Sequence, residues 1–471
     1  TRPSSERLAA LAMRGAQLAG AQALTLGLLT TPQLHHIVRM SNGAAGCAAV
    51  GSRWGLPEWA SEAGYYEMLA GAYAELVGVG ERGAPAAVAS PLDVDCACGI
   101  GAPAVERLAA ALTAKLGAGA PALRVVNAPG SGELNTGCGA EHVQKAREPP
   151  RGLESVQAMV AGRAASLDGD ADRIVFHYFT HAGGWALLDG DKIAALVAGF
   201  LREQLRSALR GHTAPAASAP PRATPSTAAR PPRARSEEDE EEADGSELRA
   251  AVVQTAYANG ASSAYLLGLG VEIAAAKTGV KFLHTQALHY DLAVYFEANG
   301  HGTALFSQRL LETLCAVRDA AGAETAAESA RVLLACHRLV NQAVGDALSD
   351  LLIVDAILRR RNWSFAQWDA LYEDLPSRQT KLTVADRTAI SCTADETRVL
   401  HPAPLQAALD ELVRTVEAGR CFVRPSGTED AVRVYAEAST QQLADKLALD
   451  AARAVHVLAG GTGPAPDSFA A

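Results

Sequence analysis

The chain has no apolar run long enough to cross a bilayer and no signal-peptide pattern at its front. It also has no block of lysine and arginine, and its formal net charge is −10 at pH 7. This charge balance argues against a nucleic-acid-binding surface. We therefore expect a cytoplasmic protein with neither a membrane nor a nucleic acid as its partner.

The eight cysteines form no recognisable metal or disulfide pattern. A single residue separates Cys96 from Cys98, and no second pair follows at zinc-finger spacing. Most of the cysteines lie in apolar surroundings, as Cys315 and Cys336 do. This usage is typical of reduced, buried thiols rather than of a disulfide framework.

The composition is that of a globular protein, with 49% hydrophobic and 20% charged residues in 471. This length accommodates about three or four domains. The clearest break is 211–247, which is rich in proline, alanine and serine and carries first basic and then acidic residues. It has little with which to build a core, so we expect a disordered low-complexity insert.

Before and after this insert, apolar strand-like runs alternate with helical patterns. Strands are expected near 91–95, 122–128, 173–179 and 250–257, and the longest helix at 190–209. Such alternation indicates parallel α/β layers. The pattern changes near residue 376 to that of a smaller α+β domain. The expected domains are a partial α/β domain at 1–88, a metal-binding α/β domain at 89–210, the insert at 211–247, a sugar-binding α/β domain at 248–375 and a phosphate-binding α+β domain at 376–471.

The string SLDGDADRIV places three carboxylates, Asp168, Asp170 and Asp172, at alternating positions before an apolar strand. In an extended or turning segment alternate side chains project to one side and converge. Three hard oxygen ligands suit Mg²⁺. An EF-hand is disfavoured because its twelfth position here is Phe179, and an acidic surface turn is the alternative. Arg173, beside the three aspartates, could offset their charge or reach a phosphate.

The string RPSGTEDAVRVY has the composition that a phosphate site needs. Arg424 offers a bidentate fork, and Ser426 and Thr428 offer hydroxyl groups. The backbone around Gly427 can turn its N–H groups toward one oxygen cluster. Arg433 follows nine residues after Arg424 and could return to the same site. An ordinary turn with two exposed arginines is the alternative.

A third motif, YFEANGHGTALFS, delivers Glu297, Asn299 and His301 into a glycine-rich turn after a strand-like run. Carboxylate and amide groups suit the hydroxyls of a sugar, and His301 is a tentative proton shuttle. A structural turn is the alternative. Upstream, Thr278 and Lys281 lie in a predicted strand-to-helix turn. Together the three motifs indicate a phosphorylated sugar as the substrate.

These motifs, in this order, resemble those of the α-D-phosphohexomutase superfamily and, more narrowly, those of the phosphoacetylglucosamine mutases. The resemblance covers nearly the whole chain outside 211–247. It implies three mixed α/β domains, the first incomplete, and a smaller C-terminal α+β domain around a central cleft. The strings that carry it are GLLTTPQLHHIV, SLDGDADRIV, GDKIA, VVQTAYANGAS, KTGVKFLH, YFEANGHGTALFS, NQAVGDALSDLL and RPSGTEDAVRVYAEA.

The resemblance implies the interconversion of N-acetylglucosamine 6-phosphate and N-acetylglucosamine 1-phosphate, through a phosphoserine and a bisphosphate, toward UDP-N-acetylglucosamine. It implies a monomer in which Asp168, Asp170 and Asp172 hold Mg²⁺. The residues expected to bind the phosphosugar are Arg173, Thr278, Lys281, Glu297, Ala298, Asn299, Arg424, Pro425, Ser426, Gly427, Thr428 and Arg433.

One part of the family pattern is missing from the 471 residues. The family's catalytic loop reads T-A-S-H-N-P, and this sequence contains no Ser-His pair. The chain opens on TRPSS, which in the family follows that loop, so Ser4 and Ser5 are no substitute. We therefore expect a chain that lacks its front portion, carries no phosphoserine and is inactive alone.

Two other functions compete with a phosphoacetylglucosamine mutase. One is a non-catalytic protein that binds amino-sugar phosphates, and the other is a general hexose phosphomutase.

Overall fold

The computed structural model describes residues 4–43, 58–78, 91–210, 248–320 and 324–467. The predicted insert at 211–247 lies outside these residues. The chain forms two compact units, each built from two stretches of sequence. Unit 1 comprises Thr1–Leu209 and Ala298–Asp369, and unit 2 comprises Arg210–Glu297 and Ala370–Ala471. The predicted domain boundaries stay predictions.

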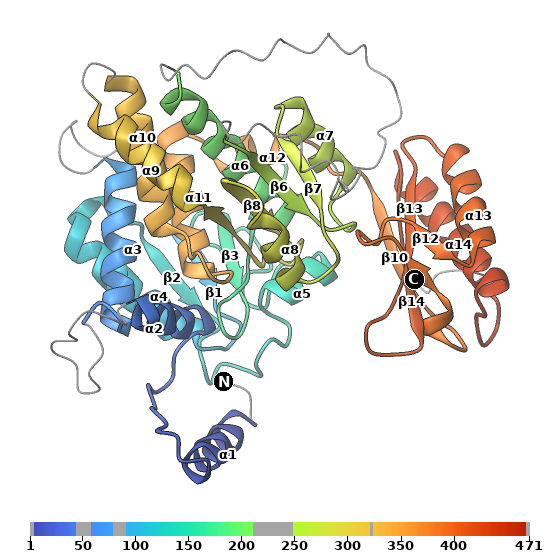
Figure 1. Ribbon diagram of the computed structural model, residues 1–471, viewed down its shortest axis with the longest axis horizontal. Coiled ribbons are helices and arrows are strands. Elements are labelled where there is room, and N and C mark those ends of the chain that lie inside the picture. The colour runs from blue at the N-terminus through green and yellow to red at the C-terminus, as the bar shows by residue number, and fades with distance from the viewer. Residues whose placement is uncertain (1–3, 44–57, 79–90, 211–247, 321–323, 468–471) are drawn as a thin grey trace. The chain divides into compact units, whose positions relative to one another are not determined.

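Unit 1 contains a five-stranded mixed sheet in the order β2-β1-β3-β4-β5; Figure 1 labels β1, β2 and β3 of this sheet. Strand β1 pairs in parallel with β2 and β3, as the alternating pattern indicates, but β3, β4 and β5 pair antiparallel. The sequence did not indicate β3, whose residues RAASL lack a strongly apolar run. The strands are β1 (Leu92–Asp95), β2 (Leu123–Val126), β3 (Arg163–Leu167), β4 (Ile174–Phe179) and β5 (Trp185–Leu188).

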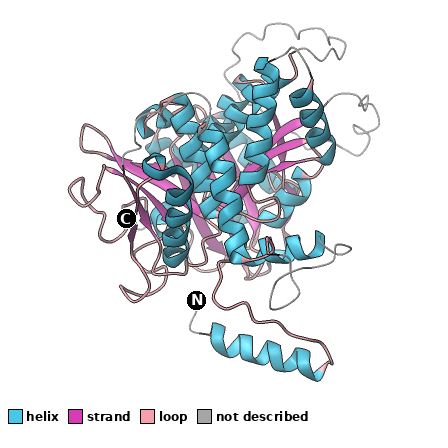
Figure 2. Cartoon of the chain, turned by 90° about the vertical axis from the view of Figure 1, so that its left-hand side faces the viewer, coloured by secondary structure: helices cyan, strands magenta, loops and turns pink. Residues whose placement is uncertain are grey.

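Helices cover the strands of this unit, as the colouring of Figure 2 shows. Several begin at a residue whose side chain accepts from a free N–H of the first turn, such as Asp189 before α6 and Asp346 before α11. The other elements of unit 1 are α1 (Ser5–Leu18), α2 (Thr31–Gly43), α3 (Glu62–Val77), α4 (Gly101–Leu116), the 3₁₀ turn η1 (Gly117–Gly119), α5 (Ala140–Ala146), α6 (Gly190–Ala208), β9 (Gly302–Phe306), α9 (Gln308–Asp319), α10 (Glu324–Leu339), α11 (Ala347–Arg361) and α12 (Phe365–Asp369).

Unit 2 begins with an α/β part in which β6 pairs in parallel with β7 and with β8. Parallel strands need crossover connections, which the helices α7 and α8 supply. Asn259, in the predicted turn, accepts from the N–H of Ala261 and so caps α7. The elements are β6 (Ala250–Gln254), α7 (Gly260–Gly268), β7 (Glu272–Ala275), α8 (Val280–Ala287) and β8 (Leu292–Phe296).

The rest of unit 2 is the smaller α+β part that the sequence predicts near residue 376. Its antiparallel sheet has the order β10-β14-β13, and apolar residues of this sheet pack with α13 and α14, among them Val423, Leu409 and Leu447. The elements are β10 (Ser377–Thr383), the 3₁₀ turn η3 (Arg387–Ala389), β11 (Ser391–Cys392), β12 (Val399–His401), α13 (Ala403–Arg414), β13 (Arg420–Pro425), β14 (Ala431–Glu437) and α14 (Gln441–Leu458).

Two findings in the described part of the chain relate to its composition. None of its helices combines the length and the apolar character that a bilayer span needs. Its cysteines are all free thiols, and five of them are buried: Cys96, Cys98, Cys138, Cys336 and Cys421.

Candidate functional site

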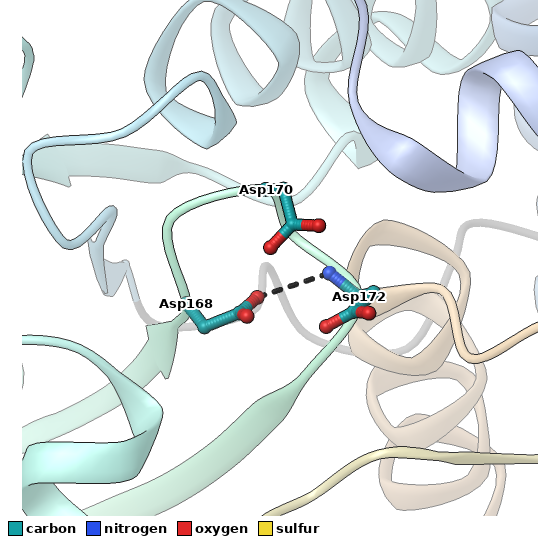
Figure 3. Close-up of side chains that lie close together, drawn as sticks. All are labelled: Asp168, Asp170 and Asp172. Carbon is teal, nitrogen blue, oxygen red and sulfur yellow. Dashed lines mark hydrogen bonds between the residues drawn. The ribbon is translucent and has the colours of Figure 1, made fainter. Parts of the chain in front are cut away.

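The three aspartates of SLDGDADRIV lie together on the turn that joins β3 to β4. One carboxylate oxygen from each of Asp168, Asp170 and Asp172 lies within 4.8 Å of the other two. Figure 3 shows the three side chains grouped around the turn. Because β3 and β4 are both interior strands of the sheet, each end of the turn is anchored.

Backbone hydrogen bonds hold the turn in this shape. The Asp168 carboxylate accepts from the N–H of Asp172 at 3.0 Å and of Arg173 at 3.2 Å; Figure 3 draws the first of these bonds. Ala171 is fully buried with a φ of +58°, so a larger side chain would have to be packed into the interior. The small residue between two aspartates is therefore a requirement of the turn.

The electrostatics of this acidic turn (residues 168–173) favour a cation. Burial, and then the charges of Asp172 and Asp170, raise the pKa of Asp168 to about 9. Burial also opposes the ionised form of Asp172, but the hydrogen bond and charge of His301 outweigh it and lower the pKa of that carboxyl. The raised pKa of Asp168 fits a hard divalent cation at this turn, because a bound cation would favour the charged form of that carboxyl.

Thr31, at the start of α2, is the contact to the acidic turn that the sequence did not reveal. Its hydroxyl donates to Oδ2 of Asp170 at 2.6 Å, and its N–H donates to the Asp170 carbonyl at 3.2 Å. Both groups belong to the first residue of a helix, where N–H groups lack intrahelical partners. The string GLLTTPQLHHIV carries the family resemblance, but nothing in its spacing points to a contact 139 residues away.

The glycine-rich turn at 298–301 also packs on the acidic turn. Nδ1 of His301 lies 3.3 Å from Oδ2 of Asp172, and Nε2 of the same ring is buried with no hydrogen-bond partner among the described residues. Asn299 accepts the His301 N–H through its side-chain oxygen at 3.0 Å. His301 is thus placed beside a predicted metal ligand. Its role as a proton shuttle stays a prediction.

The remaining predicted residues of these two motifs belong to different units. Arg173 lies 3.7 Å from Asp172 and 3.6 Å from Glu141, so it offsets two carboxylates. The Ala298 carbonyl accepts from the N–H of Gly190 at 3.2 Å within unit 1. Glu297, half-buried, follows β8 and belongs to unit 2.

In unit 2, the string RPSGTEDAVRVY forms the β13–β14 hairpin. Arg424 and Arg433 are directly opposite each other in register, and opposite residues of an antiparallel pair share a face of the sheet. The connecting turn holds Ser426, Gly427 and Thr428, and the Ser426 N–H donates to the Ala431 carbonyl at 2.8 Å. Gly427 has open space around it. Pro425 ends β13.

Three residues that the sequence did not single out hold this hairpin. Arg387 donates to the Ser426 carbonyl at 3.0 Å. The Arg424 guanidinium donates to the Tyr257 hydroxyl at 3.0 Å and lies 3.7 Å from the buried carboxylate of Glu396. None of the three belongs to a motif whose residue spacing indicates a phosphate site, so only the folded structure identifies them.

Glu396 also reaches the turn between β7 and α8, where Thr278 and Lys281 lie. It accepts from the Thr278 N–H at 3.1 Å, so one carboxylate joins Thr278 to Arg424. Lys281 is exposed, with Nζ 4.9 Å from the centre of the Phe282 ring. Unit 2 therefore groups a backbone N–H and a guanidinium around one anionic group, as a phosphate site would.

Comparison with known proteins gives matches over most of the chain. Family profiles described as phosphoacetylglucosamine mutase AMG1 match residues 57–175 for domain II and 235–363 for domain III. The profile of the phosphoglucomutase/phosphomannomutase C-terminal domain matches residues 391–454. The phosphoacetylglucosamine mutase of Mus musculus is 40% identical over 99% of this chain and 76% of its own length. That of Arabidopsis thaliana is 41% identical over 98% of this chain and 76% of its own length.

The chain belongs to the phosphoacetylglucosamine mutase family. The mixed α/β phosphohexomutase fold predicted from the sequence is confirmed by solved structures of this family. The N-acetylphosphoglucosamine mutase of Aspergillus fumigatus, in complex with GlcNAc-6P and magnesium, has a TM-score of 0.76 and 36% identity over 96% of this chain and 81% of its own. An N-acetylglucosamine-phosphate mutase in its substrate complex has a TM-score of 0.76 and 32% identity, covering 96% of this chain and 74% of its own.

Proposed function

We propose that this chain is a Mg²⁺-dependent phosphoacetylglucosamine mutase, which interconverts N-acetylglucosamine 6-phosphate and N-acetylglucosamine 1-phosphate. The observation that carries the proposal is the convergence of three carboxylates within 4.8 Å in a member of this family. The Aspergillus fumigatus relative, whose structure holds GlcNAc-6P and magnesium, supports the choice of substrate and metal. In this proposal the protein is a cytoplasmic monomer. Its product would be used to form UDP-N-acetylglucosamine.

In this proposal Asp168, Asp170 and Asp172 hold the metal, which when bound neutralises charge on the transferring phosphoryl group. The Thr31 hydroxyl, at the start of α2, donates to one oxygen of Asp170. This bond also sets the orientation of the other oxygen of that carboxylate. His301 restrains Asp172 in the same way. Arg173, half-buried between Asp172 and Glu141, would meet a phosphate oxygen next to the acidic turn.

The phosphate that does not react would be bound at the β13–β14 hairpin by Arg424, Pro425, Ser426, Gly427, Thr428 and Arg433. Glu396 lies 3.7 Å from Arg424 and accepts from the Thr278 N–H. It therefore occupies two groups that a phosphate would use. A bound phosphate would take over these interactions, and Thr278 and Lys281 would then contribute to its binding. Glu297, Ala298 and Asn299 would contact the sugar.

We further propose that turnover requires a phosphoserine and passes through a bisphosphate, as the family pattern implies. The 471 residues contain no Ser-His pair, so none of them is assigned the role of the phosphoserine. Binding of the phosphosugar can therefore be tested separately from turnover, which in this proposal needs the serine loop.

Calorimetry with the purified chain tests the function. We expect GlcNAc-6P to bind more tightly with MgCl₂ present, and Asp170→Asn to weaken Mg²⁺ binding about tenfold or more, since it removes one of three charged ligands. Asp319→Asn, which changes an exposed carboxylate of α9 paired with Arg318, should leave binding unchanged.

Three other outcomes would each contradict a different part of the proposed function. Preference for glucose 6-phosphate over GlcNAc-6P would favour a general hexose phosphomutase. Conversion of GlcNAc-6P to its 1-phosphate by the purified chain would refute the need for a serine loop. Absence of binding for both sugars would overturn the proposed function.

A further inference from the structure

Two cysteines lie close together, one of them in the loop after β1 that contacts the acidic turn. Sγ of Cys98 is 4.0 Å from Sγ of Cys138, although 40 residues separate them. Cys98 follows β1 and Cys138 precedes α5. Because a disulfide brings its two sulfurs to about 2 Å, a change of side-chain rotamer with a small backbone shift would close this gap.

The two sulfurs differ in environment, as the attacking and resolving thiols of a redox pair do. Nη2 of Arg151 donates to the Cys98 sulfur at 3.5 Å, and the Ser131 hydroxyl lies at 3.5 Å from the same atom. Arg151 and Ser131 are both exposed, so Cys98 lies just beneath the surface and in contact with a guanidinium group. Cys138 is fully buried, and burial raises the pKa of its thiol to about 12.

The turn that carries Cys98 touches the acidic turn through its backbone. The Ile100 N–H donates to the Gly169 carbonyl at 3.1 Å, and a Cβ on Gly99 would lie only 2.2 Å from that oxygen. Gly169 itself stands between Asp168 and Asp170. Residues 97–99 are therefore in close backbone contact with the residue between two of the grouped carboxylates, so we expect a movement of one to disturb the other.

We propose that Cys98 and Cys138 are a redox modification site, which an oxidant of the peroxide class converts to a disulfide that disturbs the acidic turn. The Cys98 thiolate attacks one peroxide oxygen, the O–O bond breaks, and the leaving hydroxide takes a proton to become water. The Cys138 sulfur then attacks the sulfenic sulfur of Cys98 and loses its proton. The S–O bond breaks, and a second water leaves. Two thiols lose two electrons, and hydrogen peroxide becomes two waters.

Peptide mapping of the full chain after hydrogen peroxide treatment tests the pairing. We expect a Cys98–Cys138 linked peptide that disappears on reduction and forms before the half-exposed Cys315 is oxidised. In Cys138→Ala, Cys98 should stop at the sulfenic acid, which dimedone traps. In Cys98→Ser, Cys138 should stay reduced. Cys315→Ser is the control and should leave the linkage unchanged.

Hydrogen exchange tests the effect on the acidic turn without requiring metal or turnover. Peptides that span 167–173 should exchange at least ~10-fold faster in the oxidised chain than in the reduced one, if local opening becomes easier. Failure to form the linked peptide would overturn the redox pair. A linked peptide with unchanged exchange at 167–173 would overturn its coupling to the acidic turn. Neither result depends on the identity of the sugar.

Discussion

Gly300 and Gly183 have the same backbone φ of +83° but different surroundings. A Cβ on Gly183 would meet nothing within 4 Å, whereas a Cβ on Gly300 would lie 1.8 Å from the carbonyl oxygen of Ile174. Ile174 is the first residue of β4 and its N–H donates to the Gly300 carbonyl. The two glycines therefore separate the effect of backbone conformation from the effect of close packing.

Gly183→Ala should lower the free energy of unfolding by about 1–2 kcal/mol, the cost of a left-handed alanine. Gly300→Ala should lower it by about 2–5 kcal/mol, because overpacking adds to that cost. Urea unfolding followed by tryptophan fluorescence measures both, since the tryptophans among the described residues all lie in unit 1. Equal losses for the two variants would show that the 298–301 turn is not packed on β4.

His177 is buried on β4 in a neutral form that its neighbours enforce. The indole N–H of Trp185 donates to Nδ1 at 3.3 Å, so the ring proton resides on Nε2, which faces the Ser166 hydroxyl at 3.1 Å. A second ring proton, on Nδ1, would face the indole N–H of Trp185, so two donors would oppose each other. Burial lowers the pKa of His177 to about 3.

Because the folded-state pKa lies below the unfolded value near 6.5, the unfolded chain binds more protons between these values. His177 should therefore reduce stability as the pH falls from 6.5 toward 3, by up to ~1.4 kcal/mol per pH unit. Unfolding free energies at pH 7, 6 and 5 should fall less steeply in His177→Gln than in the parent chain. The exposed His181→Gln should keep the parent slope, and an unchanged slope in His177→Gln would contradict the assignment.

At the scale of elements, α2 acts on the acidic turn through its first residue. Thr31→Val removes the hydroxyl that donates to Asp170 and should cost about 1.5–3 kcal/mol, the range for a bond to a charged acceptor. It should also raise the Kd for Mg²⁺, because Asp170 loses the contact that orients it. Thr31→Ser keeps the hydroxyl and should restore both values. Calorimetry and urea unfolding give the two readouts, and parent-like values in Thr31→Val would refute this role.

The elements that the sequence predicts best are those with a clear apolar pattern. The amphipathic run at 190–209 gives α6 at Gly190–Ala208, and the nearly continuous apolar run at 173–179 gives β4, in which consecutive residues are buried. The convergence of the three aspartates follows equally from local spacing. Strand β3 went unpredicted because its pairing with β1 and β4 stabilises residues of low strand propensity.

The same limit explains the missing site residues. Thr31 contacts Asp170 from 139 residues away, and Glu396 reaches Thr278 from 118 residues away. Such contacts depend on how elements pack, and no spacing within one motif encodes them. Arg424 and Arg433 are an intermediate case, because a short hairpin turn fixes their register and lies within a single motif.

At the scale of a whole unit, one buried ion pair links the two stretches of chain that form unit 2. Arg420 donates to both oxygens of Glu437 at 2.7 and 2.9 Å and to the carbonyls of Ala256 and Ala258 at 2.8 and 2.6 Å. Glu437, 1% exposed, also accepts from the Gly260 N–H. The C-terminal sheet is thereby joined to the turn before α7.

Glu437→Gln should destabilise unit 2 by about 2–4 kcal/mol, because Arg420 keeps its charge without its partner. The matched control is Asp445→Asn, which breaks the bidentate pair with Arg378 at the surface and should cost less than about 1 kcal/mol. Unit 2 holds no tryptophan, so hydrogen exchange of peptides covering 256–260 and 420–437 is the measurement. Similar exchange in both variants would contradict the asymmetry.

The division of unit 1 into two stretches also determines the order in which it is completed during translation. A ribosome that has released residue 209 has delivered the whole five-stranded sheet, but α10 and α11, which pack on α3 and α6, are still to be made. The Tyr65 hydroxyl, for example, donates to the carboxylate of Asp346, which is translated 281 residues later. Until then the parts of α3 and α6 that contact α10 and α11 in the folded chain are uncovered. The nascent chain therefore needs protection from aggregation while β6, α7 and the following elements of unit 2 emerge.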